Sequence, residues 1–279
     1  MYDVGMSALV ANEAYCLAEL ADAIGKDPRT SRSLRARGDR LRDNIWRHLW
    51  DPSRSVFANR YRTVGSGTDA SFVRAITPTS FYPLLLPLPE ANSTFLGEHA
   101  SKPSETVDSM VGAWLLNASR FCLSPDGDFT GNDPDNCYWG LPSVSADDPA
   151  YMADGLWNYW RGYVWGPMAQ IVYWSLQERG ATPRIPPRAD DGSPVADEAD
   201  FRQQRRITPL EPPSPLNVTR ARKALCSQME ALMLSQWEKN RHICENYSPF
   251  RNATECTGTR FYHWGALNGL IGLIEAGYF

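Results

Sequence analysis

Apolar residues recur at helical spacing along most of this chain, and this pattern constrains its fold more than any other feature. The stretches cover residues 3–25, 30–49, 77–83, 106–121, 159–178, 216–237 and 262–276. They predict six or seven helices, about half of those that a closed (α/α)6 toroid requires. An α-solenoid is the alternative, but solenoid repeats keep a fixed period and these stretches do not. We therefore expect an all-α fold of the toroid type.

The remaining stretches read as turns and loops within one domain that covers residues 1–279. Asp51-Pro52-Ser53 and the alternating residues that follow predict a short turn or hairpin between Trp50 and Arg62. Residues 181–215 are rich in Pro, Arg and Asp and lack apolar periodicity, so we expect a solvent-exposed insertion or disordered loop there.

Composition narrows the classes of partner. The net charge of −4 and the pI near 5.6 disfavour nucleic acid and anionic membranes as main partners. No stretch approaches the roughly 20 apolar residues that cross a bilayer, so we expect no membrane contact from this segment. The chain holds 10 Trp and 12 Tyr, and several of them fall in polar, irregular stretches. Flat aromatic faces of this kind suit a pyranose ring.

A lone carboxylate among aromatic residues marks the last part of the chain. Glu245 lies in Cys-Glu-Asn-Tyr-Ser-Pro, which we expect to be a loop, and Phe-Tyr-His-Trp-Gly follows at residues 261–265. Glycosidases need a carboxylate to handle a proton and aromatic faces to hold a sugar. On pattern alone, a surface Glu beside a core helix is an equal alternative.

A second aromatic run occurs at residues 159–168, where the sequence reads Tyr-Trp-Arg-Gly-Tyr-Val-Trp-Gly-Pro-Met. Trp160 and Trp165 offer stacking surfaces, and Arg161 can bind sugar hydroxyls or keep a catalytic carboxylate ionised. The structural alternative is a helix start with Arg161 in an ion pair. A third stretch carries adjacent Asp147 and Asp148, which suit either a hard cation or the capping of a turn, and we favour capping. The cysteines and histidines show no ligand spacing, so no metal or other cofactor is expected.

These segments resemble inverting α-glucosidases of glycoside hydrolase family 63, which are also similar to trehalases. The resemblance covers most of the chain outside 181–215 and implies that Glu245 is the general base. It also implies that six residues line the substrate site: Trp160, Arg161, Trp165, Tyr247, His263 and Trp264. Residues 77–83 and 138–149 belong to the resemblance too; we expect mainly packing from the first and a place near the pocket for the second.

The start of the chain resembles the segment that follows the family's general-acid motif, Gly-x-Asp-Asn-Ser-Pro. That register puts the acid upstream of Met1 and gives Asp3 a role in orienting the site wall. The expectation is therefore the C-terminal part of a catalytic domain acting on an oligosaccharide or small α-glucoside, with the mannosyl-oligosaccharide glucosidases as type members. A trehalase-like hydrolase is the rival of the same fold, although the Gly-rich run typical of trehalases is missing. A catalytically inactive sugar-binding remnant is the rival of another class.

The glycosylation triplets suggest a secretory lumen, such as the endoplasmic reticulum, or secretion, and this location would permit disulfides. Five Asn-x-Ser/Thr triplets occur, at Asn92, Asn117, Asn217, Asn246 and Asn252, and Asn246 is the poorest candidate because Pro249 and Glu245 crowd it. We expect buried thiols at Cys16 and Cys226, which lie on helical patterns. Two disulfides are also expected, Cys244–Cys256 around Glu245 and Cys122–Cys137.

Overall fold

The computed structural model describes residues 1–62, 70–90, 102–123, 140–152, 158–180, 216–250 and 256–278. Within these ranges the helices are α1 (Val4–Ala23), α2 (Pro28–Leu49), the 3-10 helix η1 (Pro78–Leu85), α3 (Pro103–Trp114), α4 (Gly166–Gly180), α6 (Leu216–Asn240) and α7 (His263–Glu275). The strands form three short antiparallel pairs: β1 (Trp50–Asp51) with β2 (Val56–Phe57), β3 (Arg60–Arg62) with β4 (Ala70–Phe72), and β5 (Cys244–Tyr247) with β6 (Cys256–Arg260). Helices dominate, which confirms the all-α prediction.

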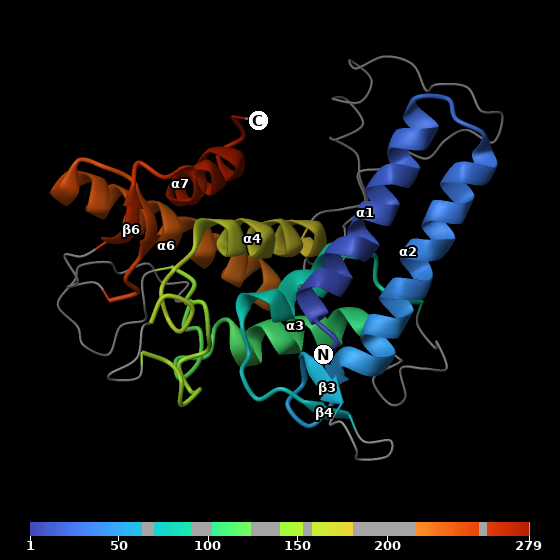
Figure 1. Cartoon of the computed structure of the whole chain (residues 1–279), viewed down its shortest axis with the longest axis horizontal. Helices are drawn as coiled ribbons and strands as arrows, with labels where there is room; N and C mark the ends of the chain where they lie inside the picture. The colour runs from blue at the N-terminus through green and yellow to red at the C-terminus, as the bar shows by residue number, and fades with distance from the viewer. Residues whose placement is uncertain are drawn as a thin grey trace.

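The first two helices form a long antiparallel pair that projects from the rest of the chain (Figure 1). Alanines, among them Ala8, Ala11 and Ala18, form the buried face of α1 and are 0% exposed. The larger apolar side chains of the same helix are exposed: Met6, Val10, Leu17, Leu20 and Ile24, which we call the α1 ridge. The sequence pattern instead places Val10, Leu17 and Leu20 on the buried stripe. Alanines form that stripe, and the larger Tyr15 packs against Gly38 of α2.

Helix starts follow capping chemistry rather than apolar content. The carboxylate of Asp3 accepts a hydrogen bond of 2.8 Å from the backbone N–H of Met6, and this caps α1. In the second helix Asp27 accepts from Arg29 N–H at 2.9 Å and Pro28 takes the first turn. The helix therefore begins before residues 30–31, where the sequence predicts a cap.

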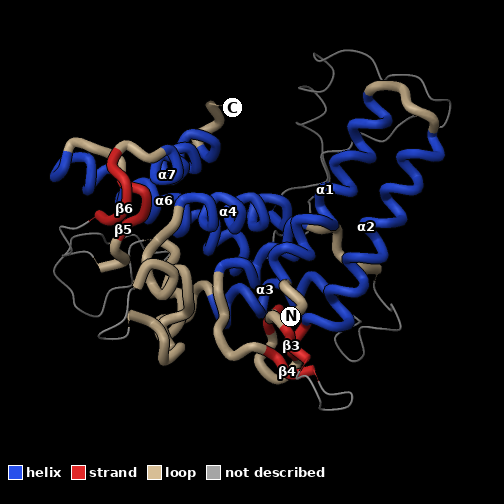
Figure 2. The backbone as a smooth tube through the Cα atoms, in the orientation of Figure 1, coloured by secondary structure: helices blue, strands red, loops and turns tan. Residues whose placement is uncertain are grey.

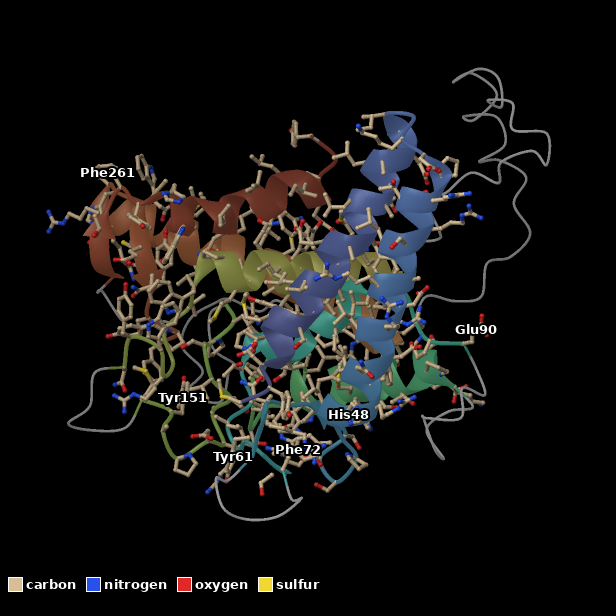
Figure 3. The ribbon with its side chains drawn as sticks, turned by 45° about the vertical axis from the view of Figure 1, so that its right-hand side comes forward. His48, Tyr61, Phe72, Glu90, Tyr151 and Phe261 are labelled. Atoms are coloured by element: carbon tan, nitrogen blue, oxygen red, sulfur yellow. The ribbon has the colours of Figure 1, made fainter. Side chains whose placement is uncertain are left out.

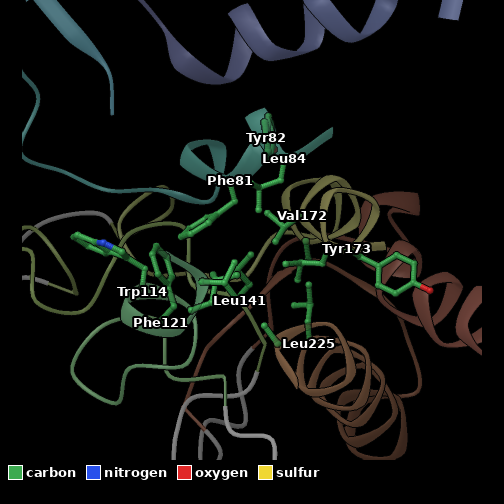
Figure 4. Packing of buried hydrophobic residues seen from close by; sticks show 14 of the residues in the cluster. Phe81, Tyr82, Leu84, Trp114, Phe121, Leu141, Val172, Tyr173 and Leu225 are labelled. Carbon is green, nitrogen blue, oxygen red and sulfur yellow. The ribbon is translucent and has the colours of Figure 1, made fainter. Parts of the chain in front are cut away.

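The core lies where η1, α3, α4 and α6 meet (Figure 4). Phe81 of η1 meets Phe121 edge to face, with ring centroids 5.6 Å apart, and Leu225 of α6 is fully buried in the same cluster. The prediction that residues 77–83 serve packing is confirmed, since Ser80 to Leu84 are all buried. Pro83 lies inside this element, which suits a short 3-10 helix better than an α-helix.

Two predicted helices are shorter than their apolar patterns. The third helix ends at Trp114, and the chain then turns at Asn117, whose side-chain oxygen accepts a hydrogen bond of 2.9 Å from Ser119 N–H. The fourth begins at Gly166 rather than at Tyr159, because Gly162 has a φ of +145°, outside the helical region. The segment 181–215 lies outside the described residues.

The cysteines only partly follow the predictions. Cys226 is a free, buried thiol as expected, but Cys16 is exposed. Cys122 and Cys244 are each in a disulfide. The predicted Cys244–Cys256 bridge is wrong, because β5 pairs with β6 so that Cys256 faces Tyr247 and Cys244 faces Arg260. Three residues of strand separate the two Cα atoms by about 10 Å, beyond the roughly 7 Å reach of a disulfide. Because Cys16 and Cys226 are free, the bonded Cys244 must then pair with Cys122 or Cys137, so the predicted Cys122–Cys137 bridge is wrong as well.

Candidate active site

Glu245 lies on β5, a strand and not the predicted loop, at the end of the molecule away from β3 and β4 (Figure 2). Beside β5 runs the segment that leads into α4. Val164 N–H donates to Tyr247 C=O at 2.8 Å, and Tyr247 N–H donates back to Val164 C=O at 3.1 Å. Two stretches more than 80 residues apart in sequence are thereby joined through their main chains. Extended pairing on both sides explains why this stretch is a strand.

Two hydrogen bonds hold the carboxylate of Glu245. The Tyr159 hydroxyl donates to Oε1 at 2.5 Å, and the backbone N–H of Thr259 donates to Oε2 at 2.9 Å. The hydrogen bond to the carboxylate in turn raises the pKa of Tyr159 to about 12, because it favours the protonated phenol, and the negative charge of Glu245 adds to the effect. Glu245 is half-buried. It is thus fixed in orientation and still in reach of solvent.

Gly258, directly across the hairpin, makes room for this carboxylate. A Cβ atom at Gly258 would lie 2.7 Å from Cβ and 2.9 Å from Cδ of Glu245, which is closer than carbon atoms pack. Its φ of +79° also lies in the left-handed region that side chains disfavour. The position of the carboxylate therefore depends on a glycine at this place.

Four aromatic side chains gather beside Glu245: Tyr159, Trp160, Trp165 and Trp264, which we call the aromatic wall. Trp160 and Trp165 stack with centroids 4.1 Å apart and planes 12° from parallel. Trp165 is 1% exposed and Trp160 is 51% exposed. Only Trp160 of this pair can therefore offer a face to a sugar ring, with Trp165 as its backing. The prediction that Trp165 itself contacts substrate is not supported by this burial.

The start of α7 supplies the rest of the wall. Trp264 is half-buried and meets Trp165 at 5.7 Å between centroids, whereas His263 is exposed and stacks on Tyr262 at 4.8 Å. A Cβ at Gly265 would meet Tyr247 Oη at 2.7 Å and Ile243 Cγ2 at 2.9 Å. The missing side chain lets the first turn of α7 lie against β5, and so brings Trp264 to the wall.

Tyr247 and Arg161 differ from the other predicted contacts. Tyr247 is 0% exposed, and its hydroxyl lies 3.4 Å from Cys244 N and 3.5 Å from Gly265 O. The prediction that it binds substrate is corrected on this ground, because its ring is part of the core under the site. Arg161 lies in the turn before α4, where its C=O accepts from Met152 N–H at 2.8 Å. The role of its guanidinium stays a prediction.

Of the adjacent aspartates, Asp148 caps a local turn as favoured from the sequence, whereas Asp147 pairs with a distant arginine. Asp148 accepts a hydrogen bond of 2.8 Å from Ala150 N–H, and Asp147 accepts from Arg120 Nε at 3.2 Å. Among the described residues, no three His, Cys, Asp or Glu side chains form a group able to hold a metal ion. None of the helices in the described ranges is long and apolar enough to cross a membrane.

A separate cleft of about 500 Å³ lies between α1, α2 and β3; His48, labelled in Figure 3, is one of the residues that line it. The described residues that line it include His48 and Arg60 but no carboxylate. The guanidinium of Arg60 is engaged, since it donates to His48 C=O at 3.0 Å and to Ala70 C=O at 2.7 Å. Hydrolysis of a glycosidic bond requires carboxylates. The site at Glu245 is therefore the better catalytic candidate.

Three supporting residues escaped the reading of the sequence: Tyr159, Gly258 and Thr259. Tyr159 had a weak signal, since it begins the aromatic run that contains Trp160. Gly258 is the single glycine between residues 250 and 260, but nothing in the sequence pairs it with Glu245. The contribution of Thr259 is a backbone N–H, which no side-chain pattern reveals.

Solved structures share this fold. Two structures from Thermus thermophilus are similar: one described as an uncharacterized conserved protein (TM-score 0.55, 19% identity) and one of a GH63 mannosylglycerate hydrolase in complex with glucose (TM-score 0.51, 17% identity). Each alignment covers 96% of this chain but only 46% and 44% of those chains. A chain described as a sialidase aligns over 98% of this chain and 19% of its own length, with a TM-score of 0.56 and 15% identity.

At these identities the structural matches show the fold alone, and they support the predicted toroid-type architecture. A search of the curated proteins found no match. The family comparison is more specific, because residues 1–265 match the mannosylglycerate hydrolase MGH1-like glycoside hydrolase domain. That match spans nearly the whole chain and includes β5, β6 and the aromatic wall. The chain therefore belongs to the family of MGH1-like glycoside hydrolase domains.

Proposed function

We propose that this chain contributes the general base to an inverting glycoside hydrolase that acts on an α-linked glucoside. The observation that carries the proposal is the orientation of Glu245. Its carboxylate is held by Tyr159 and Thr259, stays in reach of solvent, and lies beside an exposed tryptophan. An inverting base takes a proton from the water that attacks the anomeric carbon, so it must be both fixed and hydrated.

The aromatic wall supplies the binding half of the mechanism. Trp160 presents its exposed face, and the buried Trp165 beneath it keeps that face in place. A pyranose stacked there buries its apolar face against the indole, and its hydroxyls can hydrogen-bond to polar groups. We assign Arg161 and His263 to those hydroxyls, because one follows Trp160 and the other precedes Trp264 in sequence.

The acid partner comes, in this proposal, from residues that precede Met1 in the full protein. Solved chains of the same fold are more than twice as long, since this chain spans 46% and 44% of the two from Thermus thermophilus. The α1 ridge, with Met6 at 61% and Ile24 at 60% exposure, is the kind of apolar surface that a further helix layer covers. The chain is then the C-terminal part of the toroid, and the acid is the Asp of a Gly-x-Asp-Asn-Ser-Pro segment.

The substrate class is proposed as an oligosaccharide or small α-glucoside, as for the mannosyl-oligosaccharide glucosidases. One of the similar structures is a mannosylglycerate hydrolase, so a sugar linked to a small acid is the natural second substrate to assay. We propose a lumenal or extracellular location, supported by the disulfides at Cys122 and Cys244, because such bonds persist in oxidising compartments.

The test is Glu245→Gln in the full-length protein, assayed on both substrate classes. The amide keeps the shape and removes the proton acceptor, so kcat should fall by about 10²–10⁴-fold while substrate binding is kept. The matched control is Glu238→Gln, which neutralises an exposed carboxylate on α6. If wild-type protein binds glucosides but turns over neither class, the inactive sugar-binding alternative holds; if Glu245→Gln keeps wild-type kcat, Glu245 is not the base.

A further inference from the structure

We propose that Tyr159 is a positioning residue that fixes the carboxylate of Glu245 through its hydroxyl. This inference rests on the proposed function of Glu245 as a base. The hydroxyl donates to Oε1 at 2.5 Å, a short contact between residues 86 positions apart in sequence. Hydrogen bonds to an ionised acceptor are short and strong, so this contact selects one rotamer of the Glu245 side chain.

Contacts with residues other than Glu245 also hold the ring of Tyr159 in place. The indole N–H of Trp165 donates to the carbonyl oxygen of Tyr159 at 2.8 Å, and the two rings meet edge to face at 4.5 Å. The same ring also meets Trp160 edge to face, with centroids 5.4 Å apart. Because Trp165 is buried, the hydroxyl is directed at the carboxylate by the core and not by Glu245 alone.

The two donors bind different oxygens of the Glu245 carboxylate. Tyr159 holds Oε1 and Thr259 N–H holds Oε2, so the plane of the carboxylate is set. Each oxygen has a second lone pair, and one of these is enough to accept a proton from water. Thr259 donates from the main chain, so only proline would remove that donor and it would also alter the backbone, whereas the Tyr159 hydroxyl can be removed cleanly.

The hydroxyl of Tyr159 can donate this hydrogen bond only while it is protonated. With a pKa raised to about 12 by the carboxylate, the phenol stays a donor at neutral pH and moves no proton itself. Its function is geometric, and the geometry of a base matters for the rate: a misplacement of about 1 Å costs on the order of 10²-fold. Substrate binding by Trp160 does not depend on the hydroxyl, so the effect should fall on kcat and not on KM.

The first experiment compares Tyr159→Phe with Tyr163→Phe in the full-length protein. Tyr163→Phe removes a phenol from the same turn and leaves intact the backbone C=O that accepts from Ser143 N–H. We expect kcat to fall about 10- to 100-fold in Tyr159→Phe, with KM little changed, and both to stay at wild type in Tyr163→Phe. A kcat lost in Glu245→Gln but kept in Tyr159→Phe overturns the inference alone. A kcat kept in Glu245→Gln overturns the proposed function, and the inference with it.

The second measurement needs no catalysis. In protein carrying ¹³Cζ-tyrosine, the Tyr159 resonance is assigned by its absence in Tyr159→Phe and titrated by NMR. We expect the pKa of Tyr159 to drop from about 12 toward the ordinary 10 when Glu245→Gln removes the anion. An unchanged pKa means that the hydroxyl does not contact the carboxylate, and it overturns the inference even if Tyr159→Phe loses activity.

Discussion

Adding one methyl group at Gly258 should separate the folding of the β5–β6 hairpin from the catalysis that it supports. In Gly258→Ala the new Cβ lies 2.7 Å from Cβ and 2.9 Å from Cδ of Glu245, so one of the two residues must move. Gly258 is exposed on the hairpin. Displacement of the half-buried Glu245 side chain is easier than displacement of the paired strand, and we expect the carboxylate to move.

Gly258→Ala should lower both the stability of the fold and kcat, for different reasons. The left-handed backbone of Gly258, with a φ of +79°, costs about 1–2 kcal/mol in stability for a residue with a Cβ. In a domain of this size that loss lowers Tm by about 2–4 °C per kcal/mol. A shift of about 1 Å at Glu245 lowers kcat on the order of 10²-fold. The variant should therefore remain folded and become nearly inactive.

Gly25→Ala is the matched control. Gly25 has a φ of +68°, and a Cβ there meets nothing within 4 Å, so it carries the same backbone strain without a clash. Thermal unfolding followed by circular dichroism and steady-state kinetics should show similar losses of Tm in the two variants and a lost kcat in Gly258→Ala alone. Equal kcat in both variants would refute the reasoning that Gly258 makes room for the base.

Three further predictions follow from burial. Burial raises the pKa of Tyr82 above the value near 10 that it has in an unfolded chain. The free energy of unfolding should therefore fall above about pH 10, by about 1.4 kcal/mol per pH unit for this group. Urea unfolding between about pH 9 and 11 should show a shallower fall in Tyr82→Phe than in the wild type. Tyr247→Phe should lose at most about 1 kcal/mol of unfolding free energy with kcat and KM unchanged, whereas a raised KM would restore Tyr247 as a substrate contact. Trp160→Ala should raise KM with little change in Tm, while Trp165→Ala should lower the free energy of unfolding by about 3–5 kcal/mol, as for a buried Trp. An equal fall of Tm in both variants would contradict the proposal that Trp160 contacts the sugar and Trp165 only supports it.

Helical content and helix order could be predicted from the sequence because apolar periodicity reports burial directly. Periodicity fails where another force sets the boundary. On α1 the alanines are buried while Leu17 and Leu20 are exposed, although leucine is the more apolar side chain. The start of α4 lies at Gly166 because Val164 pairs with β5, and a long-range backbone contact of this kind leaves no local trace.

The candidate site also contains residues that the sequence predicts and residues that it does not. Glu245, Trp160 and Trp264 were predictable because chemistry requires their side-chain types, and the resemblance to a known family supplied their positions. Tyr159 and Gly258 were not, since their roles depend on which strands pair and in what register. Register also explains the failed Cys244–Cys256 bridge, which closeness in sequence suggested and strand geometry forbids.

The paired hydrogen bonds between Val164 and Tyr247 have a consequence for how such a site can diverge. They tie the turn of Trp160 to the strand of Glu245 through peptide groups, which are the same whatever side chains the two residues carry. If Trp160 binds sugar and Glu245 is the base, as proposed, substitutions at Trp160 can reshape the binding surface without disturbing Glu245. Under the proposed function, libraries that randomise Trp160 and keep both Tyr159 and β5 are a rational route to new glycoside selectivity.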